Sequence, residues 1–362
     1  MMRIGKFTNL YRDVTKEGTK IPQEKYCLTG QYPIVDQGQR VIAGWWNDDD
    51  GIFKDVPAII FGDHTRAIKY MEEPFFIGAD GVKILRPTNV KDNPKYLYYA
   101  LQAAKIPNLG YSRHFKVVKE LEIRMYSRDK QDEIVRVLEK IDYLIEQRHA
   151  ETTYLDQLVK SRFIELFGDY DLTHPQESWV TIKEIGTVVG GATPKTDHDE
   201  YWGGSYRWIT PAELDADSGY IYDSVRKLTK AGVESCSLQE MPVGTVILSS
   251  RAPIGKVAIA GNTFYCNQGF KNIICKEGIT PRYLYTVLLL NVEYLNSLGR
   301  GATFKEISKG IVESIRIPVP SMELQQQFAA FVEQTDKSKL AVQKGLQELE
   351  ILKKSLMQQY FG

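Results

Sequence analysis

The sequence predicts an α+β fold in which two β-rich modules alternate with two long helices that pair as an antiparallel coiled coil. Two observations predict this plan. The segment 128–168 recurs without a gap as residues 322–362. A longer segment of short β-branched runs and glycine turns precedes each copy. A duplicated helix after each of two similar modules indicates a molecule that touches two places and holds them a fixed distance apart.

The two modules are expected at residues 1–127 and 179–320. Short runs relate them: residues 56–60 (VPAII) match 243–247 (VGTVI), and both are strand-like. Residues 95–98 (KYLY) match 282–285 (RYLY), each the start of an amphipathic helix. The linker 169–178 contains proline and polar residues, so we place a domain boundary there.

The two long helices are expected at residues 128–168 and 321–362. Apolar residues such as Ile134, Leu138 and Ile141 recur at three- and four-residue steps, and neither copy contains a proline. Forty helical residues extend over about 60 Å, so each apolar stripe needs a partner, and the other copy can provide one. The alternative is two independent helices, each packed on its own module. Identical residues occupy matched positions of the copies: Gln131/Gln325, Glu139/Glu333, Asp142/Asp336, Leu155/Leu349, Leu158/Leu352, Lys160/Lys354, Ser161/Ser355, Phe167/Phe361 and Gly168/Gly362.

Composition predicts a cytoplasmic chain of two or three domains. The length is 362 residues and the hydrophobic content is 43%. No run approaches the roughly 20 apolar residues of a membrane span, and no signal-peptide core follows the first residue. Four cysteines without CxxC spacing indicate buried thiols in a reducing compartment. The 46 basic and 46 acidic side chains balance, which argues against non-specific coating of nucleic acid but allows a reader with cations concentrated in its loops.

The sequence contains no recognisable catalytic, metal-binding or cofactor-binding constellation. Residues 250–257 (SRAPIGKV) resemble the end of a P-loop but lack its first glycine and the Ser or Thr after lysine. The run DGVK (80–83) has Gly81 where a nuclease would need a second acid, so Asp80 is interpreted as a turn residue. We therefore expect a non-catalytic protein.

Several local motifs resemble one known family. In the second module these are GGATPK (190–195), GSYRWITPAEL (204–214), SSRAPIGKVAIA (249–260), CNQGFKNI (266–273) and GATFKEISKGIVESIRIPVP (301–320). The chain resembles, over essentially its whole length, the specificity subunit of Type I restriction–modification systems, the HsdS family. In the first module, FGDHTRAIKY (61–70) and GADGVKIL (78–85) resemble a different recognition-domain subtype of the same family.

The resemblance implies a concrete function. Each module would be a target-recognition domain that reads one half of a bipartite double-stranded DNA sequence. The helices would act as a ruler for the unread spacer and as the docking surface for two adenine-N6 methyltransferase subunits and, through them, a restriction subunit. S-adenosylmethionine, ATP and Mg²⁺ would bind to those partners, and this chain would bind none of them. The alternative is a coiled-coil protein-interaction scaffold without DNA specificity.

Cationic and amide side chains in the loops are the candidate DNA contacts. Arg251 and Arg300 could pair with guanine, and Gln268 could pair with adenine. Thr193, Lys195, Lys271 and Lys305 suit phosphate contacts, and Lys256 follows a Pro-Ile-Gly turn where the backbone can approach DNA. The analogous residues of the first module are His64, Arg66, Arg113, His114 and Lys116. For each of these residues the alternative is an ordinary surface side chain or a local cap.

Apolar side chains cluster at the ends of both helical copies. They could anchor partner subunits, because buried aromatic residues dominate many protein interfaces. They could instead fold back on the nearest module. The candidate partner-binding residues are Phe163, Leu166, Phe167, Met357, Tyr360 and Phe361.

Overall fold

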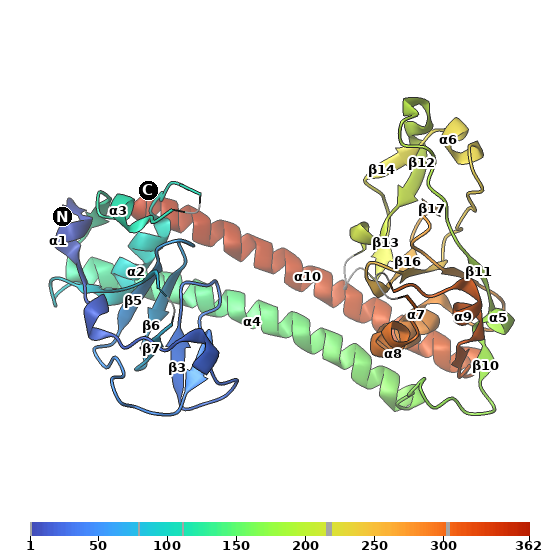
Figure 1. Cartoon of the computed structure of the whole chain (residues 1–362), viewed down its shortest axis with the longest axis horizontal. Coiled ribbons are helices and arrows are strands. Elements are labelled where there is room, and N and C mark those ends of the chain that lie inside the picture. Colours follow the sequence, from blue (N-terminus) through green and yellow to red (C-terminus); the bar gives the residue numbers. More distant parts are fainter. Residues whose placement is uncertain (1, 79, 111, 215–218, 302–304) are drawn as a thin grey trace. The chain divides into compact units, whose positions relative to one another are not determined.

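The chain folds into two compact units, each of which contains part of both long helices. A computed structural model describes residues 2–78, 80–110, 112–214, 219–301 and 305–362. Unit 1 comprises Met1–Thr152 and Ala341–Gly362, and unit 2 comprises Thr153–Leu340. The helices α4 (Arg128–Phe167) and α10 (Met322–Phe361) are therefore shared between the units (Figure 1). Both helices begin and end within one residue of the predicted segments.

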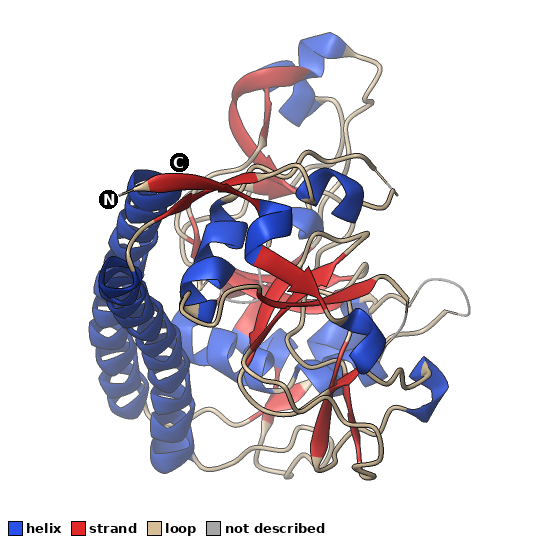
Figure 2. Cartoon of the chain, turned by 90° about the vertical axis from the view of Figure 1, so that its left-hand side faces the viewer, coloured by secondary structure: helices blue, strands red, loops and turns tan. Residues whose placement is uncertain are grey.

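The first module contains a four-stranded sheet, a three-stranded sheet and a two-stranded ribbon, drawn red in Figure 2. The larger sheet is antiparallel, in the order β2-β8-β5-β6. Its inner strand β5 reads AIIFG and is buried throughout, as expected of a short continuous apolar run. The strands are β1 (Arg3–Lys6), β2 (Tyr11–Asp13), β3 (Tyr32–Val35), β4 (Gly44–Trp46), β5 (Ala58–Gly62), β6 (Ile68–Met71), β7 (Phe76–Ile77), β8 (Val82–Pro87) and β9 (Glu122–Met125).

Helix α2 (Pro94–Ala103) packs against both this sheet and α4. It begins at Pro94 because the Asn93 side chain accepts hydrogen bonds from the backbone N–H groups of Lys95 and Tyr96, and proline suits the first helical position. Leu97 and Leu101 of α2 pack with Ile134 and Leu138 of α4 in one buried cluster. The short helices α1 (Phe7–Leu10) and α3 (Phe115–Val118) close the same core.

The second module repeats these parts with a larger sheet. Five strands run in the order β11-β18-β15-β16-β13, and three more in the order β14-β12-β17. The strands are β10 (Val180–Thr181), β11 (Gly186–Val189), β12 (Trp202–Ile209), β13 (Tyr220–Ile221), β14 (Arg226–Leu228), β15 (Val246–Ser250), β16 (Ile254–Ala260), β17 (Tyr265–Cys266), β18 (Asn272–Cys275) and β19 (Arg316–Ile317). The helices are α5 (Ile182–Ile185), α6 (Lys230–Glu234), α7 (Pro281–Leu290), α8 (Val292–Ser297) and α9 (Lys309–Ser314).

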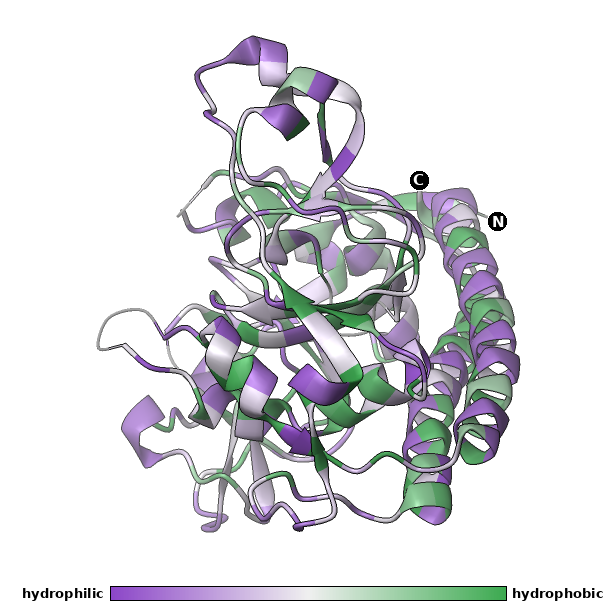
Figure 3. Cartoon of the chain, turned by 90° about the vertical axis from the view of Figure 1, so that its right-hand side faces the viewer, coloured by the Kyte–Doolittle hydropathy of each residue, from purple (hydrophilic) through white to green (hydrophobic). Residues whose placement is uncertain are grey.

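The long helices pair in opposite directions within each unit. In unit 1, Lys353 Nζ lies 2.5 Å from Asp142 Oδ1, and in unit 2, Lys339 Nζ lies 2.8 Å from Asp156 Oδ1. Within unit 1, Arg148 also lies beside Gly345, and within unit 2, Phe163 also packs on Phe328. In each unit the residue number therefore falls along α10 as it rises along α4, so the pairing is antiparallel, as predicted. Each helix also packs on a module. The structure therefore combines the predicted coiled coil with the alternative, in which each helix packs on its own module. Figure 3 shows polar and apolar residues interspersed along both helices, as an amphipathic pair requires.

Other sequence-based expectations can be compared with the described residues. All four cysteines are described and are free thiols; Cys266 is buried as expected, whereas Cys27, Cys236 and Cys275 are only half-buried. Among the helices of the described ranges, none has the length and apolarity needed to cross a membrane. Within the same ranges, no cluster of three or more His, Cys, Asp or Glu side chains could hold a metal ion. Ala79 and residues 302–304, which belong to two of the quoted motifs, lie outside the described residues.

Candidate nucleic-acid interface

Three loop segments of the second module meet at the end of strand β15. The backbone N–H of Ser250 donates to Gly269 O over 2.8 Å, and that of Ile307 donates to Ser250 O over 3.0 Å. The N–H of Lys271 donates to Leu248 O over 2.9 Å. The turn after β15, the segment before β18 and the segment before α9 are thus held together, although they are far apart in the sequence.

We call this set of three hydrogen-bonded segments the frame. Several of the predicted DNA contacts lie on it. Lys271 Nζ lies 3.1 Å from one carboxylate oxygen of Glu306, and Arg251 Nη1 lies 3.7 Å from the other. The Thr193 hydroxyl donates to Gln268 Oε1 over 2.7 Å. Arg251 keeps 43% of its side chain exposed, whereas Lys271 keeps 14%. Arg251 and Gln268 are therefore accessible to solvent, and Lys271 is largely buried.

Sequence reasoning missed Glu306, because no acidic residue was considered as a candidate. Its backbone pairs with Arg300 through two hydrogen bonds of 3.0 and 3.1 Å, and the predicted contacts Arg300 and Lys305 are both exposed. The only available sequence signal was an acid placed directly after Lys305, inside a motif that carries the family resemblance.

The two remaining lysines of the second module differ in their surroundings. Lys256 Nζ donates to Pro211 O over 3.1 Å, so its charge is partly used within the module. Lys195 is exposed, and its backbone carbonyl accepts a hydrogen bond from the Trp202 indole over 3.2 Å. Lys195 therefore suits a phosphate contact better than Lys256 does.

The first module has a related frame at the end of β5. The N–H of Asp63 donates to Gly81 O over 2.6 Å, and that of His114 donates to Asp63 O over 2.9 Å. Arg113 is exposed beside this frame, and His64 is half-buried. Arg66 has a φ of +62° and donates to Ile106 O over 3.2 Å, so its guanidinium partly braces the loop. Lys116 is exposed on α3.

The prediction that His114 contacts DNA is wrong. The side chain is fully buried, at 0% exposure. Its Nδ1 donates to Asp63 O over 2.9 Å, since a carbonyl can only accept, and its Nε2 accepts from the Leu109 N–H over 3.1 Å. The ring is thus a neutral imidazole that ties the segment before α3 to the end of β5.

The prediction that Phe163 and Phe167 anchor a partner is also wrong. Their exposures are 2% and 8%, and both pack in the core of unit 2 against Tyr283 and Phe328. Side chains four residues apart share one helix face, and here that face is turned to the module. The alternative, folding back on the nearest module, is the correct one for this pair.

The other four candidate anchors are half-buried. Leu166 packs beside the core of unit 2, and Met357, Tyr360 and Phe361 pack beside that of unit 1. Met357 also borders a cavity of about 480 Å³ between the ends of α2 and α10. Part of each side chain stays accessible, so partner docking by these four remains a prediction.

Most of the chain is similar to known proteins. The family model described as "Type I restriction modification DNA specificity domain" matches residues 1–154 and 177–351, and so includes most of both modules and both helices. The chain belongs to this family of specificity subunits. The resemblance drawn from the sequence motifs is therefore confirmed.

Individual members of the family show how far the likeness extends. The specificity subunit of the Type I restriction enzyme MjaIX from Methanocaldococcus jannaschii is 43% identical over 185 residues, which are 49% of this chain and 43% of that protein. The EcoR124I/EcoR124II specificity subunit from Escherichia coli is 27% identical and aligns over 97% of this chain and 90% of its own length. These relatives are specificity subunits, which agrees with the expectation of a non-catalytic protein.

Solved structures of the family share the fold. The crystal structure of the S subunit from M. genitalium has a TM-score of 0.61 and 16% sequence identity, over 100% of this chain and 96% of that chain. A structure from a study of complex assembly of the Type I system has a TM-score of 0.54, also at 16% identity.

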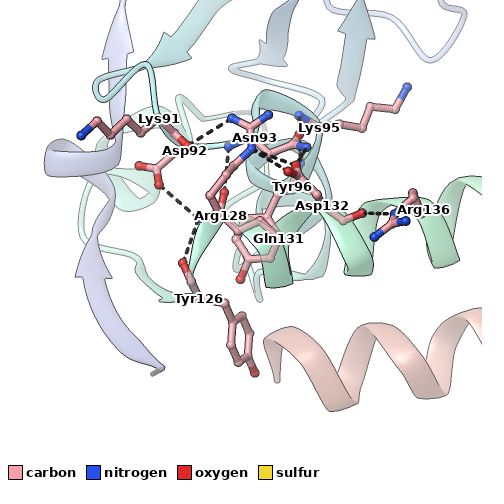
Figure 4. Close-up of polar contacts among 10 residues, drawn as sticks. All are labelled: Lys91, Asp92, Asn93, Lys95, Tyr96, Tyr126, Arg128, Gln131, Asp132 and Arg136. Carbon is pink, nitrogen blue, oxygen red and sulfur yellow. Dashed lines mark hydrogen bonds and ion pairs between the residues drawn. The ribbon is translucent and has the colours of Figure 1, made fainter.

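In this family member, a buried glutamine joins each module to the start of its long helix. Gln131 is 1% exposed. Its Oε1 accepts from the Asn93 N–H over 2.7 Å, and its Nε2 donates to Asp92 Oδ1 over 3.1 Å and to Tyr126 O over 3.0 Å (Figure 4). The amide therefore connects the cap of α2 to the first turn of α4.

The duplicated residue Gln325 makes the equivalent connection in unit 2. It is 0% exposed, accepts from the Thr280 N–H over 2.8 Å, and donates to Gly278 O over 3.1 Å and Pro320 O over 2.9 Å. Thr280 caps α7 as Asn93 caps α2. Gln131 and Gln325 are thus identical residues that make the same connection between a module and the start of its long helix.

Replacing Gln325 by leucine is expected to lower the free energy of unfolding of unit 2 by about 1–3 kcal/mol, because it leaves partly buried backbone groups without their hydrogen bonds. Denaturant unfolding measures the change. Gln326→Leu is the matched control, since Gln326 is the exposed neighbour on the same helix and should change stability by less than about 0.5 kcal/mol. Equal effects of the two substitutions would contradict the claim that Gln325 connects the module to its helix.

Proposed function

We propose that this chain is the DNA-reading subunit of a Type I restriction–modification complex and that each module reads one half of a bipartite target. One observation carries the proposal: the DNA specificity family model matches both modules of a chain whose modules and helices are duplicated. The exposed donors Arg113 and Gln268 and the half-buried Arg251, beside the two frames, support it, because base edges are read by such side chains.

The chemistry of modification and cleavage would belong to partner subunits. We expect two methyltransferase subunits, one for each copy of the duplicated helix, and a restriction subunit that joins through them. S-adenosylmethionine would serve the methyltransferase subunits, and ATP and Mg²⁺ the restriction subunit. In this arrangement the present chain selects the DNA sequence and the partners act on it.

Genome-wide mapping of N6-methyladenine tests the proposal. Cells that express the cognate methyltransferase subunit are compared with and without this chain. We expect a split motif that appears only when the chain is present. If the two proteins form a stable complex but the methylation pattern does not change, the chain is a scaffold without DNA specificity.

A binding measurement gives independent support. Binding of the assembled complex to duplex DNA should weaken steeply as salt rises, because contacts with phosphates release counterions. Flat salt dependence would favour the scaffold, since protein or peptide ligands lack a condensed counterion layer.

A further inference from the structure

The two modules share a backbone frame at three positions. In the second module, Ser250 donates its N–H to Gly269 O and accepts from the Ile307 N–H. In the first module, Asp63 donates its N–H to Gly81 O and accepts from the His114 N–H. Asp63 therefore corresponds to Ser250, Gly81 to Gly269, and His114 to Ile307. In both cases the first of these residues lies at the end of the inner strand, β5 or β15.

The frame residues that carry side chains are buried. Exposures are 4% for Asp63 and 0% for Ser250, His114 and Ile307. Their side chains serve the fold, so they cannot meet a ligand. The turn that follows the inner strand contains, in each module, a non-glycine residue in the left-handed region, Arg66 or Ala252. Such conformations are uncommon and often occur at functional loops.

The residues adjacent to the frame are half-buried or exposed. The residue after the first frame position is His64 or Arg251. The residue before the second is Asp80 or Gln268, and the residue before the third is Arg113 or Glu306. In the second module the Arg251 guanidinium lies 3.7 Å from the Glu306 carboxylate.

In the first module, Asp80 forms an ion pair with Lys20 over 2.5 Å and lies near enough to Arg113 to feel its charge. The pKa of Asp80 is lowered, mainly by its hydrogen bond to Lys20 and further by the positive charges of Lys20 and Arg113. The His64 ring lies beside Gly81, because a Cβ built on that glycine would be 3.0 Å from His64 Cδ2. Equivalent backbone positions thus carry these three residues beside the frame in both modules.

The chemistry at these positions differs between the modules. An acid, Glu306, stands where the first module has the base Arg113. An amide, Gln268, corresponds to the carboxylate Asp80, and a guanidinium, Arg251, corresponds to the imidazole of His64. The phosphate groups of DNA are the same whatever its base sequence. Contacts with phosphates therefore give no reason for these side chains to differ between the two modules. Carboxylates are also poor neighbours for phosphates, whereas they can accept a hydrogen bond from cytosine N4.

We propose that His64, Asp80 and Arg113 are the base-selecting residues of the first module, and that Arg251, Gln268 and Glu306 are those of the second. This proposal rests on the proposed function and deepens it, because it assigns the choice of bases to specific side chains. Arg113 and Arg251 suit guanine, Gln268 suits adenine, and Asp80 and Glu306 suit cytosine. Lys271, 3.1 Å from Glu306, acts as a positioning residue that holds the carboxylate beside Arg251.

The substitutions Glu306→Gln and Arg113→Gln test the assignment, with N6-methyladenine mapping in cells that contain the methyltransferase subunit. Glu306→Gln should change or relax the base preference in one half-site, lowering discrimination there by about 5- to 150-fold, the equivalent of 1–3 kcal/mol. Arg113→Gln should do the same in the other half-site. The spacer and the unaltered half-site should stay as in the wild type in each case.

Lys305→Gln is the matched control, because Lys305 is exposed, adjoins Glu306 and is assigned to a phosphate. It should reduce methylation evenly across all sites and leave the motif unchanged. An unchanged motif with evenly reduced methylation for Glu306→Gln and Arg113→Gln as well would overturn the base-selecting assignment. Absence of any motif with the wild-type chain would instead overturn the proposed function. Glu306→Gln conserves side-chain size, so it keeps the test valid if Arg113→Gln fails to assemble.

Discussion

Insertion of seven residues after Arg148 in α4, together with seven after Gly345 in α10, is expected to lengthen the unread spacer by about three base pairs. The two sites face each other in unit 1, where a Cβ on Gly345 would lie 3.8 Å from Arg148 Nε. Seven residues add about 10 Å of helix, DNA rises about 3.4 Å per base pair, and a whole heptad keeps the apolar seam in register. Methylation mapping would show the new spacing.

The half-site bases should not change in this variant, because the insertions lie in the helices and leave both modules intact. Insertion in α4 alone is the control. It shifts the seam of one helix against the other and should abolish methylation at the old and the new spacing. A changed half-site with the original spacer would refute the ruler role of the helices.

Replacing Phe163 by alanine is expected to destabilise unit 2 by about 3–5 kcal/mol, since it leaves a cavity where a large aromatic ring was buried. The ring centroid of Phe163 lies 4.9 Å from that of Phe167, 5.4 Å from that of Phe328 and 5.7 Å from that of Tyr283. Denaturant unfolding of the purified chain, followed by tryptophan fluorescence, measures the loss.

Tyr154→Ala provides the comparison for this substitution. Tyr154 is an aromatic residue of the same helix and is 67% exposed, so its loss should cost less than about 0.5 kcal/mol. If Phe163→Ala left stability unchanged but abolished binding of the methyltransferase subunit, Phe163 would be an interface anchor and its burial against unit 2 would have no energetic weight.

The positions of the candidate DNA contacts were only partly predictable. The sequence indicated Arg113 and His114 together, since both are polar residues of one loop, yet the structure exposes the first and buries the second. Arg251 and Lys271 were predicted separately, and only the fold shows that they share the carboxylate of Glu306. The matched frames of the two modules could not be found from the sequence, because they consist of backbone hydrogen bonds between distant segments.

The sequence by itself determined the plan of the protein: two similar modules, two duplicated helices, and where those helices begin and end. These features depend on local physics, namely the apolar period of a helix and the absence of proline within it. Only the tertiary structure decided which side chains face solvent. Phe163 and Phe167 turned inward and Glu306 joined Arg251 because burial and ion pairing depend on neighbours that are remote in the chain, and a residue's own sequence context does not specify those neighbours.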